Sequence, residues 1–140
     1  EYPLLTVCAA SVHDTTTLRE WWEREADREG FWRALGLPGT PSPEYSEDTA
    51  DKIFAGILRT GSVLAMFQLQ DFLGLVPEFR AADPVEERIN VPGTGADTNW
   101  SYRTPFKIEE FGAHKPLKKK IRALLKDRHS LIPPRRASRQ

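Results

Sequence analysis

Near its start the chain reads Leu4-Leu5-Thr6-Val7-Cys8-Ala9-Ala10, a nearly unbroken apolar and β-branched run without alternation of polar and apolar residues. Such a run is typical of a strand that is covered on both faces in a parallel sheet. Val63 to Leu69 has the same character apart from Gln68. The sequence therefore predicts two buried parallel strands, one at residues 4–10 and one at residues 63–69.

The sequence between these two strands is helical. Thr17-Leu18-Arg19-Glu20 has the spacing of a capping box at the start of a first helix, which Gly30 interrupts. Ser46-Glu47-Asp48 opens a second helix, and Gly61 is placed to end it. A strand, helices and a second strand form a crossover unit, which predicts an α/β fold with parallel strands and a right-handed connection.

After the second strand the chain becomes less regular. Asp71-Phe72-Leu73-Gly74-Leu75 is expected to be a short turn, and residues 83–105 are polar and punctuated by Gly and Pro with little periodicity. A basic helix around Leu117 to Leu125 follows. We therefore expect one structured portion over residues 1–128 and a disordered basic tail over residues 129–140.

The composition limits the partners that the chain can attract. Its 20 basic and 20 acidic side chains give no net charge, so no whole-chain field collects a polyanion, and neutral partners are favoured. Lys118-Lys119-Lys120 is interpreted as the solvated face of a helix, because no aromatic side chains are interleaved with it. We predict no nucleic-acid partner.

The sequence lacks the features of membrane, secreted and metal-binding proteins. The longest apolar run is much too short to cross a bilayer and the start has no basic signal-peptide region, so we predict no membrane association and a cytoplasmic location. The single Cys8 has no partner for a disulfide, and no His or Cys spacing suits a metal. We therefore predict no metal and no cofactor.

The most informative polar stretch is Ser11-Val12-His13-Asp14-Thr15-Thr16-Thr17, where a buried strand ends and a helix begins. Ligands bind at this edge of parallel α/β folds, and a carboxylate beside an imidazole serves metal binding, proton transfer or stabilisation of a cationic transition state. The alternative is that Asp14 caps the helix and His13 is an ordinary loop residue. Because Thr17 already provides a cap, Asp14 is free to face a cleft.

A second polar group lies in the irregular segment, in Arg88-Ile89-Asn90-Val91-Pro92-Gly93-Thr94 and in Asn99-Trp100-Ser101-Tyr102-Arg103. Planar amides, guanidinium groups and aromatic rings are the groups that recognise sugars, through paired hydrogen bonds to hydroxyls and packing on apolar sugar faces. The alternative is a structural turn at residues 91–93 with Trp100 in the core. Composition alone favours the structural turn.

Taken together, these motifs resemble a known family. Val7 to Asp14, with the Trp21-Trp22 pair downstream, is similar to the seventh-strand motif of the glucanotransferases of glycoside hydrolase family 77. Leu69 to Leu75, Arg88 to Thr94 and Asn99-Trp100 with Arg103 resemble that family's eighth strand and following loop, in the same order. The resemblance covers most of residues 4–110.

The resemblance implies both a fold and an activity. The fold would be the C-terminal portion of a (β/α)8 barrel, with the last two strands and their helices, because a full barrel needs roughly 250 residues. The activity would be that of a 4-α-glucanotransferase, which moves α-1,4-glucan units between sugar acceptors by a retaining mechanism. The partners would be maltose, maltodextrins, glucose as an acceptor, and the remainder of the barrel.

The resemblance also assigns roles to residues. Asp14 matches the family's third carboxylate, which stabilises the transition state, while the motifs of the nucleophile and of the acid/base are absent from this chain. The predicted substrate-binding residues are His13, Asn90, Asn99, Trp100 and Arg103. We therefore expect the chain to be inactive alone.

The sequence leaves one alternative for the whole chain, a noncatalytic carbohydrate-binding or structural remnant of the same fold. The chain has no initiator Met and opens directly on residues of strand character, so we expect it to be a piece of something longer.

Overall fold

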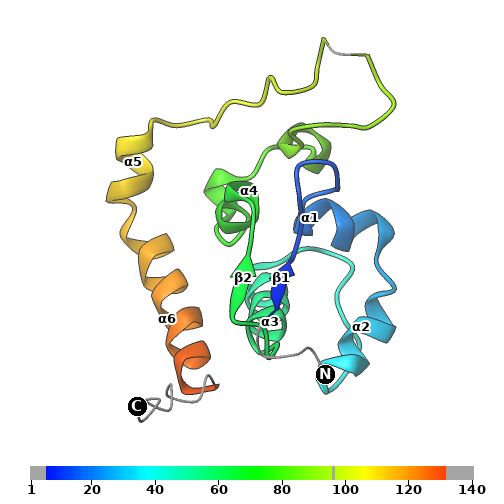
Figure 1. Ribbon diagram of the computed structural model, residues 1–140, viewed down its shortest axis with the longest axis vertical. Coiled ribbons are helices and arrows are strands. Elements are labelled where there is room, and N and C mark those ends of the chain that lie inside the picture. Colours follow the sequence, from blue (N-terminus) through cyan, green and yellow to red (C-terminus); the bar gives the residue numbers. More distant parts are fainter. Residues whose placement is uncertain (1–5, 96, 132–140) are drawn as a thin grey trace, which may run out of the picture.

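The computed structural model describes residues 6–95 and 97–131. In chain order the elements are β1 (Val7–Ala9), α1 (Leu18–Glu20), the π-helical turn η1 (Trp21–Glu25), α2 (Arg28–Ala34), α3 (Glu47–Leu58), β2 (Leu64–Met66), α4 (Leu69–Leu73), the 3-10 helices η2 (Pro77–Phe79) and η3 (Pro84–Glu87), α5 (Ile108–Ala113) and α6 (Lys115–Leu131). Two strands lie side by side at the centre, where α3 overlaps them in the view, with α1 and α2 to the right and α6 to the left (Figure 1).

The two strands form a parallel pair, which confirms the predicted strand–helices–strand unit. Val7 pairs with Leu64 and Ala9 pairs with Met66. The N–H of Ala10 donates to the carbonyl of Met66 at 3.0 Å, so the ladder continues one residue beyond β1. Both strands are shorter than predicted, and residues 4 and 5 of the predicted first strand lie outside the described residues.

The prediction that both faces of the strands are covered is wrong for the described residues. Val7, Leu64 and Met66 are 54%, 55% and 58% exposed, and they share one face of the pair. Cys8 and Ala65 point to the other face and are partly buried, as side chains alternate along a strand. The helices of this chain therefore cover only one side of its sheet.

α3 provides most of the core on the covered side. The hydroxyl of Ser46 accepts from the N–H of Thr49 at 3.1 Å, which satisfies one free donor at the start of the helix. Ile53 and Phe54 are fully buried, and Phe54 stacks on Phe67 with ring centroids 4.4 Å apart. The helix ends at Leu58, three residues before the predicted terminator Gly61.

The helical segment after β1 differs from the prediction of one helix interrupted at Gly30. The chain leaves the helical conformation at Ala26 and Asp27, and Gly30 lies inside α2. Asp27 caps this new helix by accepting from the N–H of Gly30 at 3.0 Å. A Cβ at position 30 would lie 2.1 Å from an Asp27 carboxylate oxygen, so the glycine leaves room for the cap.

Trp21 and Trp22 point in different directions, as expected for consecutive helical positions, which are about 100° apart. Trp22 is fully buried in the core, and Trp21 is partly buried with its ring edge-on to Phe31.

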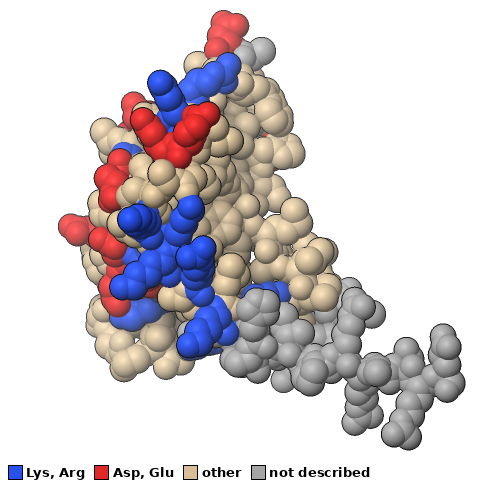
Figure 2. Space-filling view, turned by 90° about the vertical axis from the view of Figure 1, so that its left-hand side faces the viewer, with Lys and Arg blue, Asp and Glu red and all other residues tan. Residues whose placement is uncertain are grey.

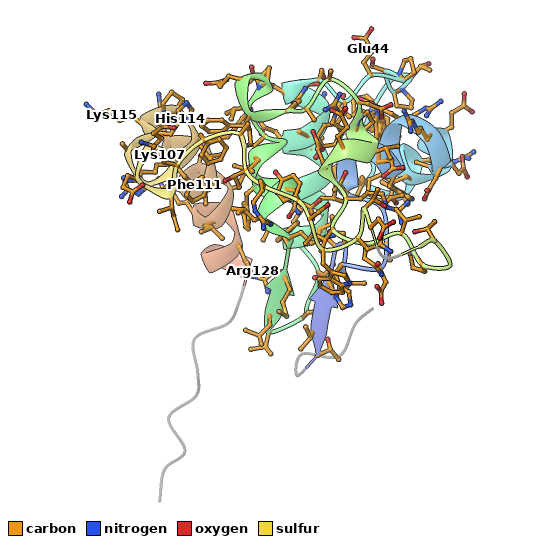
Figure 3. The ribbon with its side chains drawn as sticks, turned by 90° about the horizontal axis from the view of Figure 1, so that it is seen from above. Glu44, Lys107, Phe111, His114, Lys115 and Arg128 are labelled. Carbon is orange, nitrogen blue, oxygen red and sulfur yellow. The ribbon has the colours of Figure 1, made fainter. Side chains whose placement is uncertain are left out.

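The C-terminal helix α6 is part of the folded unit. Leu117 is buried in the core, and the Arg128 guanidinium donates to the carbonyls of Leu58 at 2.8 Å and Ser62 at 2.5 Å, where α6 lies against the body of the chain (Figure 3). The helix reaches Leu131 and so includes the first three residues of the predicted disordered tail. Residues 132–140 of that tail lie outside the described residues.

Lys and Arg side chains gather on the face of the molecule that carries α6 (Figure 2). Lys118 and Lys119 are exposed, whereas Lys120 is partly buried and its ammonium group donates to Glu47 at 2.8 Å and to the Leu75 carbonyl at 2.9 Å. One lysine of the run therefore ties α6 to α3. Within the described ranges, none of the helices has the length and apolar character needed to cross a membrane.

Candidate functional site

The two polar groups singled out in the sequence meet at one end of the strand pair. The loop after β1 and the short helix α4 after β2 both lie beyond the carboxyl ends of the strands, and the segment that follows η3 crosses above them (Figure 1). This is the edge at which parallel α/β folds bind ligands.

Asp14 and Asn90 are in direct contact there. The side-chain amide of Asn90 donates to Asp14 Oδ1 at 2.6 Å, although 76 residues separate the two positions. His13 Nε2 lies 3.3 Å from Asp14 Oδ2, and the side chains of His13 and Asp14 are 51% and 52% exposed. The carboxylate is therefore fixed by one neighbour and remains open to solvent and to a bound ligand.

Trp100 completes the group from residues 88–103, which form the second loop of the site. Its ring centroid lies 5.1 Å from that of His13 with a tilt of 43° between the planes, and 63% of the residue is exposed. Its backbone is left-handed, with φ of 62°, and its N–H donates to the Ile89 carbonyl at 2.7 Å. The alternative that places Trp100 in the core is wrong, and the indole is available as a stacking surface beside Asp14.

The capping alternative for Asp14 is wrong as well. The N-cap of α1 is Thr17, whose hydroxyl accepts from the N–H of Glu20 at 3.3 Å. The Asp14 carboxylate instead contacts Asn90 and His13.

Asn99 and Arg103 are placed differently from the other predicted site residues. Asn99 holds the turn at residues 91–94: its Oδ1 accepts from the N–H of Val91 at 2.9 Å and its Nδ2 donates to the Thr94 hydroxyl at 3.2 Å. Gly93 in this turn has φ of 82°, so that part of the structural alternative is correct. Arg103 is exposed and donates at 3.0 Å to the carbonyl of its neighbour Tyr102, and not to Asp14.

Two ion pairs hold the segment that carries Asn90 against the helix that follows the Asp14 loop. Arg19 donates to Glu87 at 2.7 Å, and Arg88 lies 3.8 Å from Glu20. Burial raises the pKa of both carboxyls, Glu20 and Glu87, although the arginines act in the opposite direction. The short helix α1, which follows Asp14 in sequence, therefore also holds residues 87 and 88 in place just before Asn90.

A third side chain at this edge was missed by the sequence reasoning. Asp71, expected in a turn, lies in α4 and is only 1% exposed. It accepts hydrogen bonds from the Ser11 hydroxyl, from the N–H of Leu18 at 2.8 Å and from the N–H of Gln68 at 3.1 Å. Burial raises its pKa while these donors lower it. The spacing of Gln68 and Asp71, an N-cap and the third residue of a helix, was the available signal.

A groove of about 350 Å³ lies beside the site and is lined by residues of the second loop, among them Asn90, Asn99 and Tyr102. No group of three or more His, Cys, Asp or Glu side chains in residues 6–95 and 97–131 is arranged to hold a metal ion. The polar groups at the site are an amide, an imidazole and a carboxylate beside an exposed indole, which suit a neutral, hydroxyl-rich ligand.

Comparison with known proteins agrees with this chemistry. The model of the glycoside hydrolase 77 family, described as 4-alpha-glucanotransferase, matches residues 1–108. The chain belongs to this family.

The family's members match over most of the chain. A 4-alpha-glucanotransferase of Chlamydia muridarum is 36% identical over 126 residues, which cover 89% of this chain and 23% of that relative. The 4-alpha-glucanotransferase DPE2 of Oryza sativa subsp. japonica is 30% identical over 127 residues, covering 89% of this chain and 13% of that protein. The chain thus spans less than a quarter of the length of these glucanotransferases.

One solved structure supports the fold. The amylomaltase from Streptococcus agalactiae in complex with acarbose superposes with a TM-score of 0.64 at 19% sequence identity, covering 91% of this chain and 22% of that chain. At this identity the likeness concerns the α/β arrangement alone.

Proposed function

We propose that this chain is the C-terminal part of the catalytic (β/α)8 barrel of a 4-α-glucanotransferase that moves maltose and maltodextrin units between sugar acceptors. Its two parallel strands would be the last two of the barrel, and their exposed face would look into the barrel interior. The family match over residues 1–108 and the parallel strand pair support this placement.

The observation that carries the proposal is the Asn90–Asp14 hydrogen bond of 2.6 Å at the carboxyl end of β1. A retaining transglycosylase passes through an oxocarbenium-like transition state, and a carboxylate that is already oriented stabilises the positive charge on the sugar ring. Asn90 orients one oxygen of Asp14, and the other oxygen faces His13. Asp14 is therefore the transition-state stabiliser in this proposal.

The neighbouring groups would hold the sugar. A ring nitrogen of His13 hydrogen-bonds a hydroxyl of the glucose next to the scissile bond, and the exposed indole of Trp100 packs on an apolar sugar face. Asn99 keeps the second loop in shape through its bonds to Val91 and Thr94. Arg103 would meet substrate only at the outer rim of the site.

The nucleophile and the acid/base would come from earlier strands of the barrel, so the isolated chain would transfer no glucose. We use the term full-length enzyme for a protein in which this chain follows the remaining length of a glucanotransferase. The predicted cytoplasmic location stays a prediction.

The test is Asp14→Asn in the full-length enzyme. We expect turnover in maltodextrin disproportionation to fall by on the order of a hundredfold or more, because one transition-state stabiliser is lost. Asp48→Asn is the matched control, since Asp48 is an exposed carboxylate on α3 that pairs with Lys52 of the same helix. Near-normal transfer by purified Asp14→Asn enzyme would remove the proposed role of this residue.

Glucose transfer separates the enzyme from a noncatalytic carbohydrate-binding remnant, because both would bind maltodextrin. If the full-length enzyme binds maltodextrin in calorimetry and releases glucose from maltotriose, the enzyme assignment holds. Binding without any transfer of glucose by the wild-type protein would favour the remnant.

A further inference from the structure

The loop that carries His13 and Asp14 lies on a small buried hydrogen-bond network. At its centre is Asp71 of α4, whose Oδ1 accepts from the N–H of Leu18 at 2.8 Å. Its Oδ2 accepts from the N–H of Gln68 at 3.1 Å and from the hydroxyl of Ser11. Ser11 and Leu18 stand at the two ends of the loop, so one carboxylate holds both ends.

Gln68 adds a second set of bonds at the start of the loop. Its side-chain amide donates to Ser11 Oγ and to the carbonyl of Val12, both at 2.9 Å. The Ser11 hydroxyl thus donates to Asp71 and accepts from Gln68. Inside the loop, the N–H of Thr15 donates to the Val12 carbonyl at 2.9 Å, and the N–H of Val12 donates to the Thr15 hydroxyl at 3.0 Å. Little of the loop is left without a fixed partner.

We propose that Ser11, Gln68 and Asp71 are positioning residues that set where Asp14 stands relative to the reacting sugar, an inference that rests on the proposed function. None of the three needs to touch the substrate. They join the loop after β1 to the residues after β2, and so they fix the loop that carries Asp14 to the end of the neighbouring strand. A displacement of a reacting group by about 1 Å can cost on the order of a hundredfold in rate.

The chemistry of the network explains why these side chains are of these types. An ionised carboxylate accepts three hydrogen bonds without presenting a donor of its own. An amide at position 71 would turn an N–H group toward either the Leu18 or the Gln68 backbone N–H, so one of these two bonds would be lost. At position 11, a hydroxyl can both donate and accept, which the network requires.

The experiment compares Ser11→Ala and Gln68→Met in the full-length enzyme. We expect kcat for maltodextrin transfer to fall by roughly tenfold or more in each variant and KM to rise by a smaller factor, because the displaced loop carries Asp14 and His13 while Trp100 lies on another segment. Ser46→Ala is the matched control: it also removes a serine hydroxyl that forms hydrogen bonds, but among the described residues the Ser46 hydroxyl bonds to Thr49 of its own helix and not to the site. It should lower the thermal midpoint without changing kcat.

A double-mutant cycle distinguishes positioning from general loss of structure. If Ser11 acts through Asp14, adding Ser11→Ala to Asp14→Asn should lower kcat no further. Additive losses, or Ser11→Ala and Gln68→Met enzymes with normal kcat, would overturn the positioning role. If instead Asp14→Asn alone leaves kcat unchanged, it is the proposed function that fails. Ser11→Thr, which retains the hydroxyl, should restore most of the activity lost in Ser11→Ala.

Discussion

Asp14 is hydrogen-bonded by Asn90 at one oxygen, and its other oxygen lies 3.3 Å from His13 Nε2. Asn90 donates to Oδ1 at 2.6 Å from a loop that lies 76 residues further along the chain, and about half of the Asp14 side chain remains exposed. A hydrogen bond from a neutral amide orients a carboxylate without neutralising it, so the negative charge stays available to a cationic sugar. An oriented and half-exposed carboxylate is the smallest unit of the proposed mechanism.

Asn90→Ala in the full-length enzyme should lower kcat by about tenfold, because a hydrogen bond to a charged group is worth roughly 1.5 kcal/mol or more. Asn90→Asp should lower it further, since it places a second negative charge beside Asp14. Steady-state kinetics on maltotriose measures both. Equal rates for wild type and Asn90→Ala would mean that the amide does not orient the carboxylate during turnover.

Sequence reasoning found the exposed members of the site and missed the buried one. Asp14 was predicted from its residue type and its place after a predicted strand, Asn90 was predicted from the resemblance to the family, and the structure brings the two together. The position of the Trp100 ring depends on a left-handed backbone that no local pattern announced. The role of Asp71 could not be predicted, because its partners Ser11 and Leu18 are more than 50 residues away in sequence and come into contact with it only in the folded chain.

At the scale of elements, α1 and η3 form one unit through paired charges. Glu87 of η3 is 4% exposed; its Oε1 accepts from Arg19 of α1 at 2.7 Å and from the N–H of Ala81 at 3.0 Å. Burial raises the pKa of Glu87 above its ordinary value of 4.5, although Arg19 and Arg80 lower it. The contact between α1 and η3, which joins the two loops of the site, therefore contains a carboxyl group with a shifted pKa, that of Glu87.

This contact predicts a dependence of stability on pH. Because the folded-state pKa is raised, the folded form binds the Glu87 proton more tightly than the unfolded form does. The contribution of Glu87 is therefore fully present below its unfolded-state value of 4.5 and is lost as pH rises through the higher folded-state pKa.

Glu87→Gln should flatten this part of the curve of thermal midpoint against pH, because a neutral amide still accepts from Arg19 but does not titrate. Differential scanning calorimetry of the full-length enzyme from about pH 4 to pH 8 measures it. Glu86→Gln is the matched control, since Glu86 is the exposed neighbour on the same turn. If both variants keep the wild-type slope, Glu87 does not contribute to it.

The elements themselves were predicted with unequal success. The two strands and α3 followed from apolar pattern and from the Ser46 cap, which are local features. The break before α2 was not predicted. Gly30 was interpreted as the residue that ends the first helix, whereas it lies inside α2 and leaves room for the Asp27 cap. α4 was expected to be a turn, since five residues carry too little periodicity to indicate a helix.

At the scale of the whole molecule, the sheet is two strands wide with one bare apolar face. Val7 and Leu64 are neighbours in the ladder and Met66 lies two residues further along, so their exposed side chains form one continuous surface. Strand edges without a partner add to it, because they can pair with another chain. In the proposed barrel, this surface would be covered by the other strands.

The isolated chain should therefore associate in solution, and static light scattering should give a mass above that of one chain. Leu64→Lys should reduce this association by placing a charge on the bare face. Val85→Lys introduces the same charge at an exposed valine on η3, away from the strands, and should leave the mass unchanged. A monodisperse monomer from the wild-type chain would contradict this prediction.

The bonds from Arg128 to Leu58 and Ser62 bear on how far the folded unit of this chain extends. Similarity to the family model ends at residue 108, yet Leu117 is in the core and Arg128 secures the end of α3 just before β2 begins. A gene trimmed at residue 108, where the match to the family model stops, would delete the helix that braces the second strand. The end of the family model and the end of the folded unit are therefore different places in this protein.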